Sequence, residues 1–209
     1  MFKDRQSAGQ LLANRLKDIK ADLVLGIPRG GVVVAAEIAK DLNLPLDIVV
    51  TRKIGAPGQE ELALGAVDPD GEVVWEDRLL SDLGLKIDDL KLEVLDQWKE
   101  LKRREDLYRN GRSLLDVNGK TAILIDDGIA TGATVLSAIK YLKRHGARIV
   151  LAVPVASQDA LRKVEGQVDQ SVVLEAPEYF QAVGQFYHQF EPVTDKEVIY
   201  LLEASSSRQ

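Results

Sequence analysis

Two adjacent acids, Asp126 and Asp127, lie in the segment of the chain with the clearest chemical pattern. They follow the apolar run 123–125, which is typical of a parallel strand buried on both faces. The acids lead into a loop of small and hydroxyl residues that opens a helical pattern. Its candidate ligand-binding residues are Gly128, Ala130, Thr131, Gly132, Ala133 and Thr134. Amides at a helix start and threonine hydroxyls can hold a phosphate, and paired carboxylates can accept hydrogen bonds from vicinal hydroxyls. The pattern predicts a sugar-phosphate site.

The strand, loop and helix around the acids predict where this site lies. In an open α/β sheet, ligands bind at the carboxyl ends of the strands, where such loops emerge. Two commoner phosphate loops are excluded. A Walker loop needs four residues between its glycines and then a lysine, whereas Gly128 and Gly132 are separated by three and followed by Ala133. The segment also lacks the G-x-G-x-x-G of dinucleotide-binding folds. A helix cap would explain one acid or one threonine, but not the whole array.

A hydrophobic strand, two acids and a short loop ending in Thr-Gly-Ala-Thr resemble the phosphoribosyl pyrophosphate (PRPP) signature of type I phosphoribosyltransferases. Two other segments agree with this family in their order. GIPRGG at 26–31 resembles the family's pyrophosphate loop, although an ordinary strand-to-helix turn would look similar. TRKIGAPGQEE at 51–61 resembles its flexible loop, although a basic pair is also common on surfaces. FKDR at 2–5 resembles an uncharacterised branch of the family.

The resemblance implies a role for each segment. Asp126 and Asp127 would be catalytic and hold the ribose hydroxyls, while residues 128–134 would bind the 5′-phosphate. Pyrophosphate would be bound by Arg29, Gly30 and Gly31 of the first loop and by Arg52 and Lys53 of the second. Mg²⁺ would arrive with PRPP, without a dedicated protein metal site, and the phosphoribosyl group would pass to a nitrogenous base. We also expect a cis Pro28–Arg29 bond and mobility of residues 52–61 without ligand.

The acceptor base would bind under a small hood formed by the C-terminal segment. Aromatic residues cluster between residues 179 and 190, and aromatic rings can stack on a planar base. The candidates for that role are Tyr179, Phe186 and Tyr187. The same residues could instead form the core of a small subdomain or a dimer contact.

Alternating patterns along the chain predict a doubly wound α/β fold with a mostly parallel sheet and a small hood. Expected strands are 23–27, 45–51, 63–67, 72–76, 123–125, 148–155 and 172–174, the fourth in an antiparallel hairpin with the third. Expected helices include 4–19, 32–41 and a long charged helix over 87–108. We expect one domain over 1–203, with a hood formed by about 175–203 alone or by that segment together with the N-terminal helix. Residues 204–209 are expected to be a disordered tail.

Composition limits the functions that remain. A net charge of -6 argues against nonspecific nucleic-acid binding. The absence of cysteine excludes disulfides and thiol chemistry, and no segment resembles a signal peptide or membrane span. We therefore expect a cytoplasmic enzyme that binds no nucleic acid and no membrane, and a homodimer by analogy with the family. The alternative is a PRPP-sensing regulator without catalytic activity.

Overall fold

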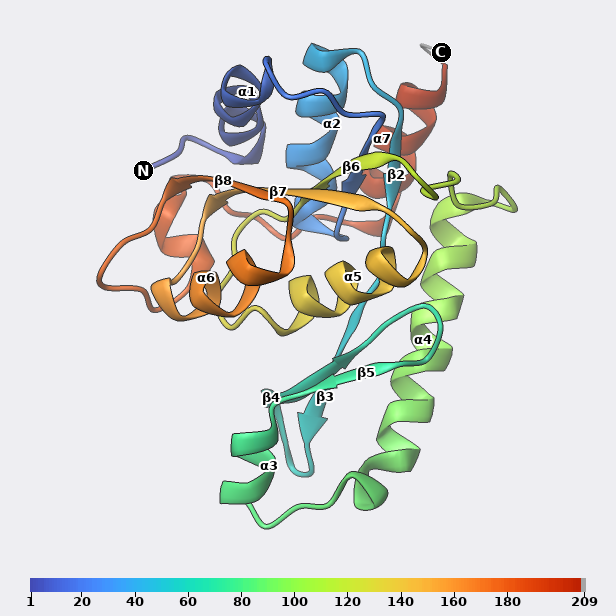
Figure 1. The fold of residues 1–209 in the computed structure, drawn as a ribbon, viewed down its shortest axis with the longest axis vertical. Coiled ribbons are helices and arrows are strands. Elements are labelled where there is room, and N and C mark those ends of the chain that lie inside the picture. Colours follow the sequence, from blue (N-terminus) through green and yellow to red (C-terminus); the bar gives the residue numbers. More distant parts are fainter. Residues whose placement is uncertain (208–209) are drawn as a thin grey trace.

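The computed structural model describes residues 1–207, without the side chains of Glu60 and Glu61. A parallel five-stranded sheet in the order β2-β1-β6-β7-β8 forms its centre (Figure 1). Its strands are β1 (Leu23–Gly26), β2 (Leu46–Ile48), β6 (Thr121–Ile125), β7 (Arg148–Val155) and β8 (Gln170–Glu175). The helices beside it are α1 (Arg5–Leu16), α2 (Gly30–Leu42), α5 (Ala133–Arg144), α6 (Gln158–Val164) and α7 (Asp195–Ser206). This arrangement confirms the predicted doubly wound fold.

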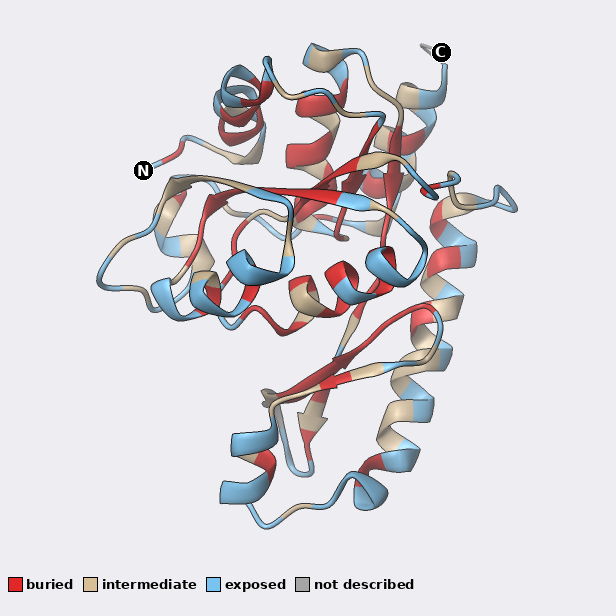
Figure 2. Cartoon of the chain, viewed as in Figure 1, coloured by how far each residue is buried: buried red, intermediate tan, exposed pale blue. Residues whose placement is uncertain are grey.

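Both faces of this sheet are covered, which explains the continuous apolar runs in its strands (Figure 2). Alternate side chains of one strand enter different cores. Val24 and Ile123 pack in the core that includes residues of α1, α2 and α7. Leu25 and Leu124 pack in the core that includes residues of α5 and α6. The period-two alternation of the strands therefore fixes which helices lie on which face.

A second, antiparallel sheet lies below the first in Figure 1, in the order β3-β4-β5. Its strands are β3 (Arg52–Ala56), β4 (Gln59–Val67) and β5 (Val73–Trp75), accompanied by α3 (Asp77–Asp82), the 3₁₀ turn η1 (Ile87–Leu90) and the long helix α4 (Lys91–Arg109). We call these elements the hairpin lobe and the rest of the chain the sheet lobe. The predicted pairing of 63–67 with 72–76 and the long charged helix are confirmed.

The expected irregular loop over 51–61 is wrong, because β3 and β4 pair there as a hairpin. Ile54 and Ala56 are buried on one side of β3, so this segment has the apolar anchoring that a strand needs. Pro57 and Gly58 form the turn, where the φ of +75° at Gly58 suits glycine. A register shift at Gly55 absorbs the irregularity that glycine introduces.

The expected tail from 204 onward is also wrong for residues 204–206, which end helix α7. Thr194 and Glu197 form a capping box that starts this helix, and Val198 and Leu202 bury its apolar side. The sequence prediction overlooked this capping signal. Residues 208–209 lie outside the described part of the chain. Within residues 1–207, no helix is both long and apolar enough to cross a membrane.

Candidate functional site

The two acids stand at the carboxyl end of β6, which lies between β1 and β7 in the sheet. Burial, and next the neighbouring charge of Asp127, raise the pKa of Asp126 well above its usual range. Burial also raises the pKa of Asp127, but the nearby Arg5 guanidinium opposes this effect. Because Asp126 and Asp127 are largely buried, their carboxyl groups favour a ligand that offers hydrogen-bond donors or positive charge.

The turn after β1 packs directly against these acids. The Pro28–Arg29 peptide bond is cis, as expected from the family resemblance. A Cβ atom at Gly30 would overlap the carboxylate of Asp127, and one at Gly31 would lie 2.8 Å from the carbonyl oxygen of Ile125. Only glycine therefore fits at either position, which brings this turn and the acid pair into one site.

The loop after the acids is fixed at its base and leads into α5. The Ile129 amide donates to the Val155 carbonyl at 2.9 Å, and the Ser157 hydroxyl donates to the Ala130 carbonyl at 2.7 Å. Gly132, with φ +85°, precedes α5, and no side chain caps the helix there. The first amides of a helix have no intrahelical partner, so this helix start offers donors to an anion.

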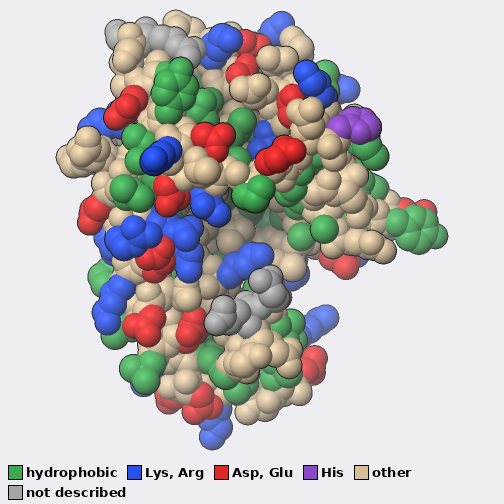
Figure 3. Space-filling view, turned by 180° about the vertical axis from the view of Figure 1, so that it is seen from behind, with side chains coloured by type: hydrophobic (Ala, Val, Ile, Leu, Met, Phe, Trp, Pro, Cys, Tyr) green, Lys and Arg blue, Asp and Glu red, His purple; other side chains and the backbone are tan. Residues whose placement is uncertain are grey.

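A cleft of about 320 Å³ brings most of the predicted residues together. Its lining includes Arg29, Gly30, Lys53, Asp126, Asp127, Gly128, Ala130, Thr131, Gly132 and Thr134. Two predicted residues, Gly31 and Ala133, are buried outside this lining. Figure 3 shows Lys and Arg side chains gathered between the two lobes on the face opposite to Figure 1. The cleft therefore combines acids, loop amides and basic side chains.

Arg52 lies outside the cleft, in a neighbouring cavity of about 710 Å³ between the hairpin and α4. Its Nε donates to Oε1 of Gln97 at 2.9 Å, and Gln97 in turn donates to Glu93. Lys53, the next residue, lines both spaces. Adjacent residues of a strand point to opposite faces, so Lys53 reaches the cleft whereas Arg52 does not.

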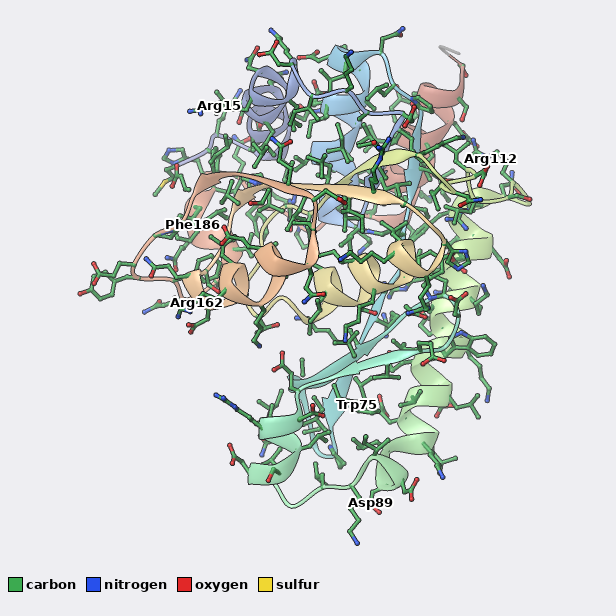
Figure 4. The ribbon with its side chains drawn as sticks, viewed as in Figure 1. Arg15, Trp75, Asp89, Arg112, Arg162 and Phe186 are labelled. Carbon is green, nitrogen blue, oxygen red and sulfur yellow. The ribbon has the colours of Figure 1, made fainter. Side chains whose placement is uncertain are left out.

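The structure does not bring the three predicted aromatic residues into the cleft. Tyr179 is 83% exposed. Phe186, which is labelled in Figure 4, packs against Phe180, and their ring centroids are 5.3 Å apart. Tyr187 is buried, and its hydroxyl donates to the backbone carbonyl of Asp127 at 2.6 Å. Tyr187 therefore belongs to the small core that the sequence left as an alternative. From the same segment, Val183 and Phe190 line the cleft instead.

Arg5, which the sequence analysis did not select, contacts Asp127 directly. Its Nε donates to Oδ2 of Asp127 at 2.7 Å, and both side chains are largely buried, with 11% and 15% exposed. Its Nη1 donates to the Glu191 carbonyl at 2.9 Å, and its Cζ lies 3.8 Å from the centroid of the Phe190 ring. The only signal in the sequence was that Arg5 ends the FKDR segment; nothing in the local pattern pairs it with an acid 122 residues away.

The geometry agrees with comparisons to known proteins. A Mycobacterium tuberculosis protein, provisionally named a phosphoribosyl transferase, is 43% identical over 208 residues, covering 97% of this chain and 46% of that protein. The chain thus spans about half the length of this relative. A crystal structure of a Thermus thermophilus protein is 41% identical with a TM-score of 0.80, covering 96% of this chain and 97% of that one.

A purine phosphoribosyltransferase structure from Pyrococcus horikoshii shares the fold, at 18% identity and a TM-score of 0.51 over 91% of this chain and 92% of that one. A family model described as the phosphoribosyl transferase domain matches residues 4–191. That match covers both loops and the acid pair that line the cleft. The chain belongs to the phosphoribosyl transferase domain family.

Proposed function

We propose that the chain binds PRPP and transfers its 5-phosphoribosyl group to a nitrogenous base, with Mg²⁺ present and pyrophosphate released. The observation that supports this most is the composition of the 320 Å³ cleft. One wall holds the acid pair and the uncapped start of α5, and another holds the turn with Arg29 and Gly30. A ribose with a phosphate on one side and a diphosphate on the other matches that order of donors and acceptors.

The proposed chemistry relies on positioning and electrostatics. As the diphosphate leaves the anomeric carbon, positive charge develops on the ribose ring and negative charge on the leaving group. Asp126 and Asp127 would accept hydrogen bonds from the ribose hydroxyls and favour the positive ring. Arg29, Lys53 and the amides of residues 29–31 would favour the departing diphosphate. No covalent enzyme intermediate is needed, so the absence of cysteine is no obstacle.

Mg²⁺ would enter this cleft as part of the bound substrate. Among the described residues, no group of three or more His, Cys, Asp or Glu side chains could hold a metal ion. The diphosphate and ribose oxygens, with water, supply the hard oxygen ligands that Mg²⁺ prefers. When bound, the ion would neutralise part of the diphosphate charge. Arg29 and Lys53 would add positive side chains beside that diphosphate.

The decisive assay is a panel of purine, pyrimidine and pyridine bases with PRPP and Mg²⁺, followed by pyrophosphate release. We expect one class of base to stimulate release well above the rate with water. PRPP binding without release for any base would instead favour the PRPP-sensing regulator. The acceptor would enter beside Val183 and Phe190, the residues of the C-terminal segment that line the cleft. A homodimer and a cytoplasmic location stay predictions from the sequence.

A further inference from the structure

We propose that Arg5 is a positioning residue that orients the Asp127 carboxylate for the ribose. This inference rests on the proposed function, because it assigns a role in PRPP binding. It concerns a residue on α1, which is remote in sequence from both loops of the cleft. Arg5 does not line the cleft itself, so it would act through Asp127.

The geometry fixes one oxygen of Asp127 and leaves the other to be assigned. Arg5 Nε donates to Oδ2 at 2.7 Å, a charge-assisted bond between two largely buried groups. We assign the second oxygen, Oδ1, to the ribose hydroxyl. A Cβ on Gly30 would meet Oδ2 of Asp127 and would lie 2.8 Å from Arg5 Nε, so the ion pair fills the space beside this turn. The pair thus joins the acid that would hold the ribose to the turn that would hold the diphosphate.

Arg5 is itself held on three sides, which makes its position well defined. The Phe190 ring lies under its guanidinium, and the Glu191 carbonyl accepts from Nη1. The first residues of the chain are tied to the same C-terminal segment, because Phe2 donates to the Phe186 carbonyl at 2.7 Å and Gln189 donates to the Lys3 carbonyl at 2.9 Å. Residues 2–5 and 186–191 therefore meet beside Asp127, and together they place the guanidinium.

The charges around Asp127 explain why a cation is needed there. Asp126 precedes it in the chain, and Tyr187 from the C-terminal segment lies against its backbone. Lys53 of β3 lies close enough to lower the pKa of Asp126, and Arg5 also contributes to lowering the pKa of Glu197 of α7. Without Arg5, burial would favour the protonated form of Asp127, because Arg5 is the largest influence that lowers the pKa of this carboxyl. A protonated carboxyl is a poorer acceptor for a hydroxyl and carries no charge to favour a cationic ring.

The test uses the full chain with Arg5→Gln, Arg5→Lys and the control Arg15→Gln. Arg15 lies exposed on the same helix, toward its other end (Figure 4). The first readout is the Asp127 carboxyl titration by ¹³C NMR without ligand, with the resonance assigned from Asp127→Asn. We expect Arg5→Gln to raise the pKa of Asp127 by about one pH unit or more, Arg5→Lys to raise it less, and Arg15→Gln to leave it unchanged.

The second readout is the pH dependence of PRPP affinity with Mg²⁺. In Arg5→Gln, we expect affinity at pH 6 to fall at least tenfold and to recover partly as the pH is raised, because a higher pH favours the ionised form of Asp127. Arg5→Lys keeps a positive charge at this position. It can be measured in the same way if Arg5→Gln does not fold. An unchanged Asp127 titration in a folded Arg5→Gln protein would overturn the inference. If the wild type binds no PRPP, the proposed function fails, but the ligand-free titration still decides the role of Arg5.

Discussion

At the residue scale, the acid pair carries most of the proposed chemistry. Replacing Asp127 with Asn removes a charge beside the ribose and leaves the Arg5 guanidinium without its partner. We expect kcat/KM for PRPP to fall by about 10²–10³-fold, the scale of losing one preorganised polar contact in a transition state. The control is Asp88→Asn, because Asp88 is exposed in η1 and lines neither cavity. Equal activity of the two variants would remove Asp127 from the mechanism.

The neighbouring acid, Asp126, should make the free energy of unfolding depend on pH. Burial and the charge of Asp127 raise the pKa of Asp126, so folding disfavours its ionised form. Its contribution to stability is therefore greatest below its unfolded pKa of about 3.9 and is lost as the pH rises through the raised folded value. Asn at position 126 can keep the bond from the Asp127 amide to Oδ1, which measures 2.8 Å.

We therefore expect Asp126→Asn to unfold at higher urea than the wild type at pH 8, in the absence of ligand. The difference should shrink as the pH approaches 4, because the wild-type carboxyl then becomes neutral. Urea titrations of both proteins at several pH values measure this directly. If the variant is instead less stable than the wild type at pH 8, the ionised Asp126 carboxylate has stabilising partners in the folded state.

The strand, loop and helix start around the acids could be predicted from the sequence, but the side chains that contact Asp127 could not. Residues 123–134 form one contiguous strand, acid pair, loop and helix start, so short-range chemistry was enough to identify them. Arg5 and Phe190 reach the same site from the two ends of the chain, and no periodicity relates them to Asp127. Tyr187 was assigned to the acceptor because aromatic rings stack on bases, although its hydroxyl bonds to a backbone carbonyl in a small core.

At the scale of elements, the hairpin of β3 and β4 is the part that we expect to move when a ligand binds in the cleft. The predicted mobility of residues 52–61 without ligand stays a prediction, although their strand structure was not expected. The hairpin buries Ile54 and Ala56, but Lys53 is exposed and lines the cleft. A ligand that Lys53 contacts would therefore hold this hairpin against the sheet lobe.

We expect amide hydrogen exchange in residues 52–59 to be faster without ligand than in β6, and to slow at least severalfold when PRPP and Mg²⁺ are added. Peptides from α6 serve as an internal control, because this helix lies outside both cavities. Exchange that is already as slow as that of β6 in the free protein would show that the hairpin is fixed. The moving element would then have to be sought elsewhere.

The segment between β8 and α7 contacts both the N-terminal residues and the backbone of Asp127. Replacing Tyr187 with Phe keeps the ring in its core but removes the 2.6 Å bond to the Asp127 carbonyl. We expect a loss of about 1–2 kcal/mol in the free energy of unfolding, because a buried carbonyl loses its donor. Denaturant unfolding measures that loss. Unchanged stability with a raised acceptor KM would restore the stacking role that the sequence suggested.

At the scale of the whole molecule, the alternating strands and helices were sufficient to predict the doubly wound sheet. Buried parallel strands need helices on both faces, and this requirement leaves few arrangements for such a chain. The hairpin lobe was less predictable, because β3 and β4 contain glycines and the lobe depends on packing against α3, η1 and α4. α7 was missed although its capping box is a local sequence signal, whereas its contacts with α2 and α4 could not be read from the sequence.

The central claim is that the cleft between the acid pair and the Gly30 turn binds PRPP. Isothermal titration of the wild-type chain with PRPP in the presence of Mg²⁺ tests it most directly, with ribose 5-phosphate and pyrophosphate as separate ligands. The account predicts saturable binding of one PRPP per chain, tighter than either fragment, and at least tenfold weaker in Asp127→Asn. No binding of PRPP by the folded wild type, or equal binding by the wild type and Asp127→Asn, would contradict it.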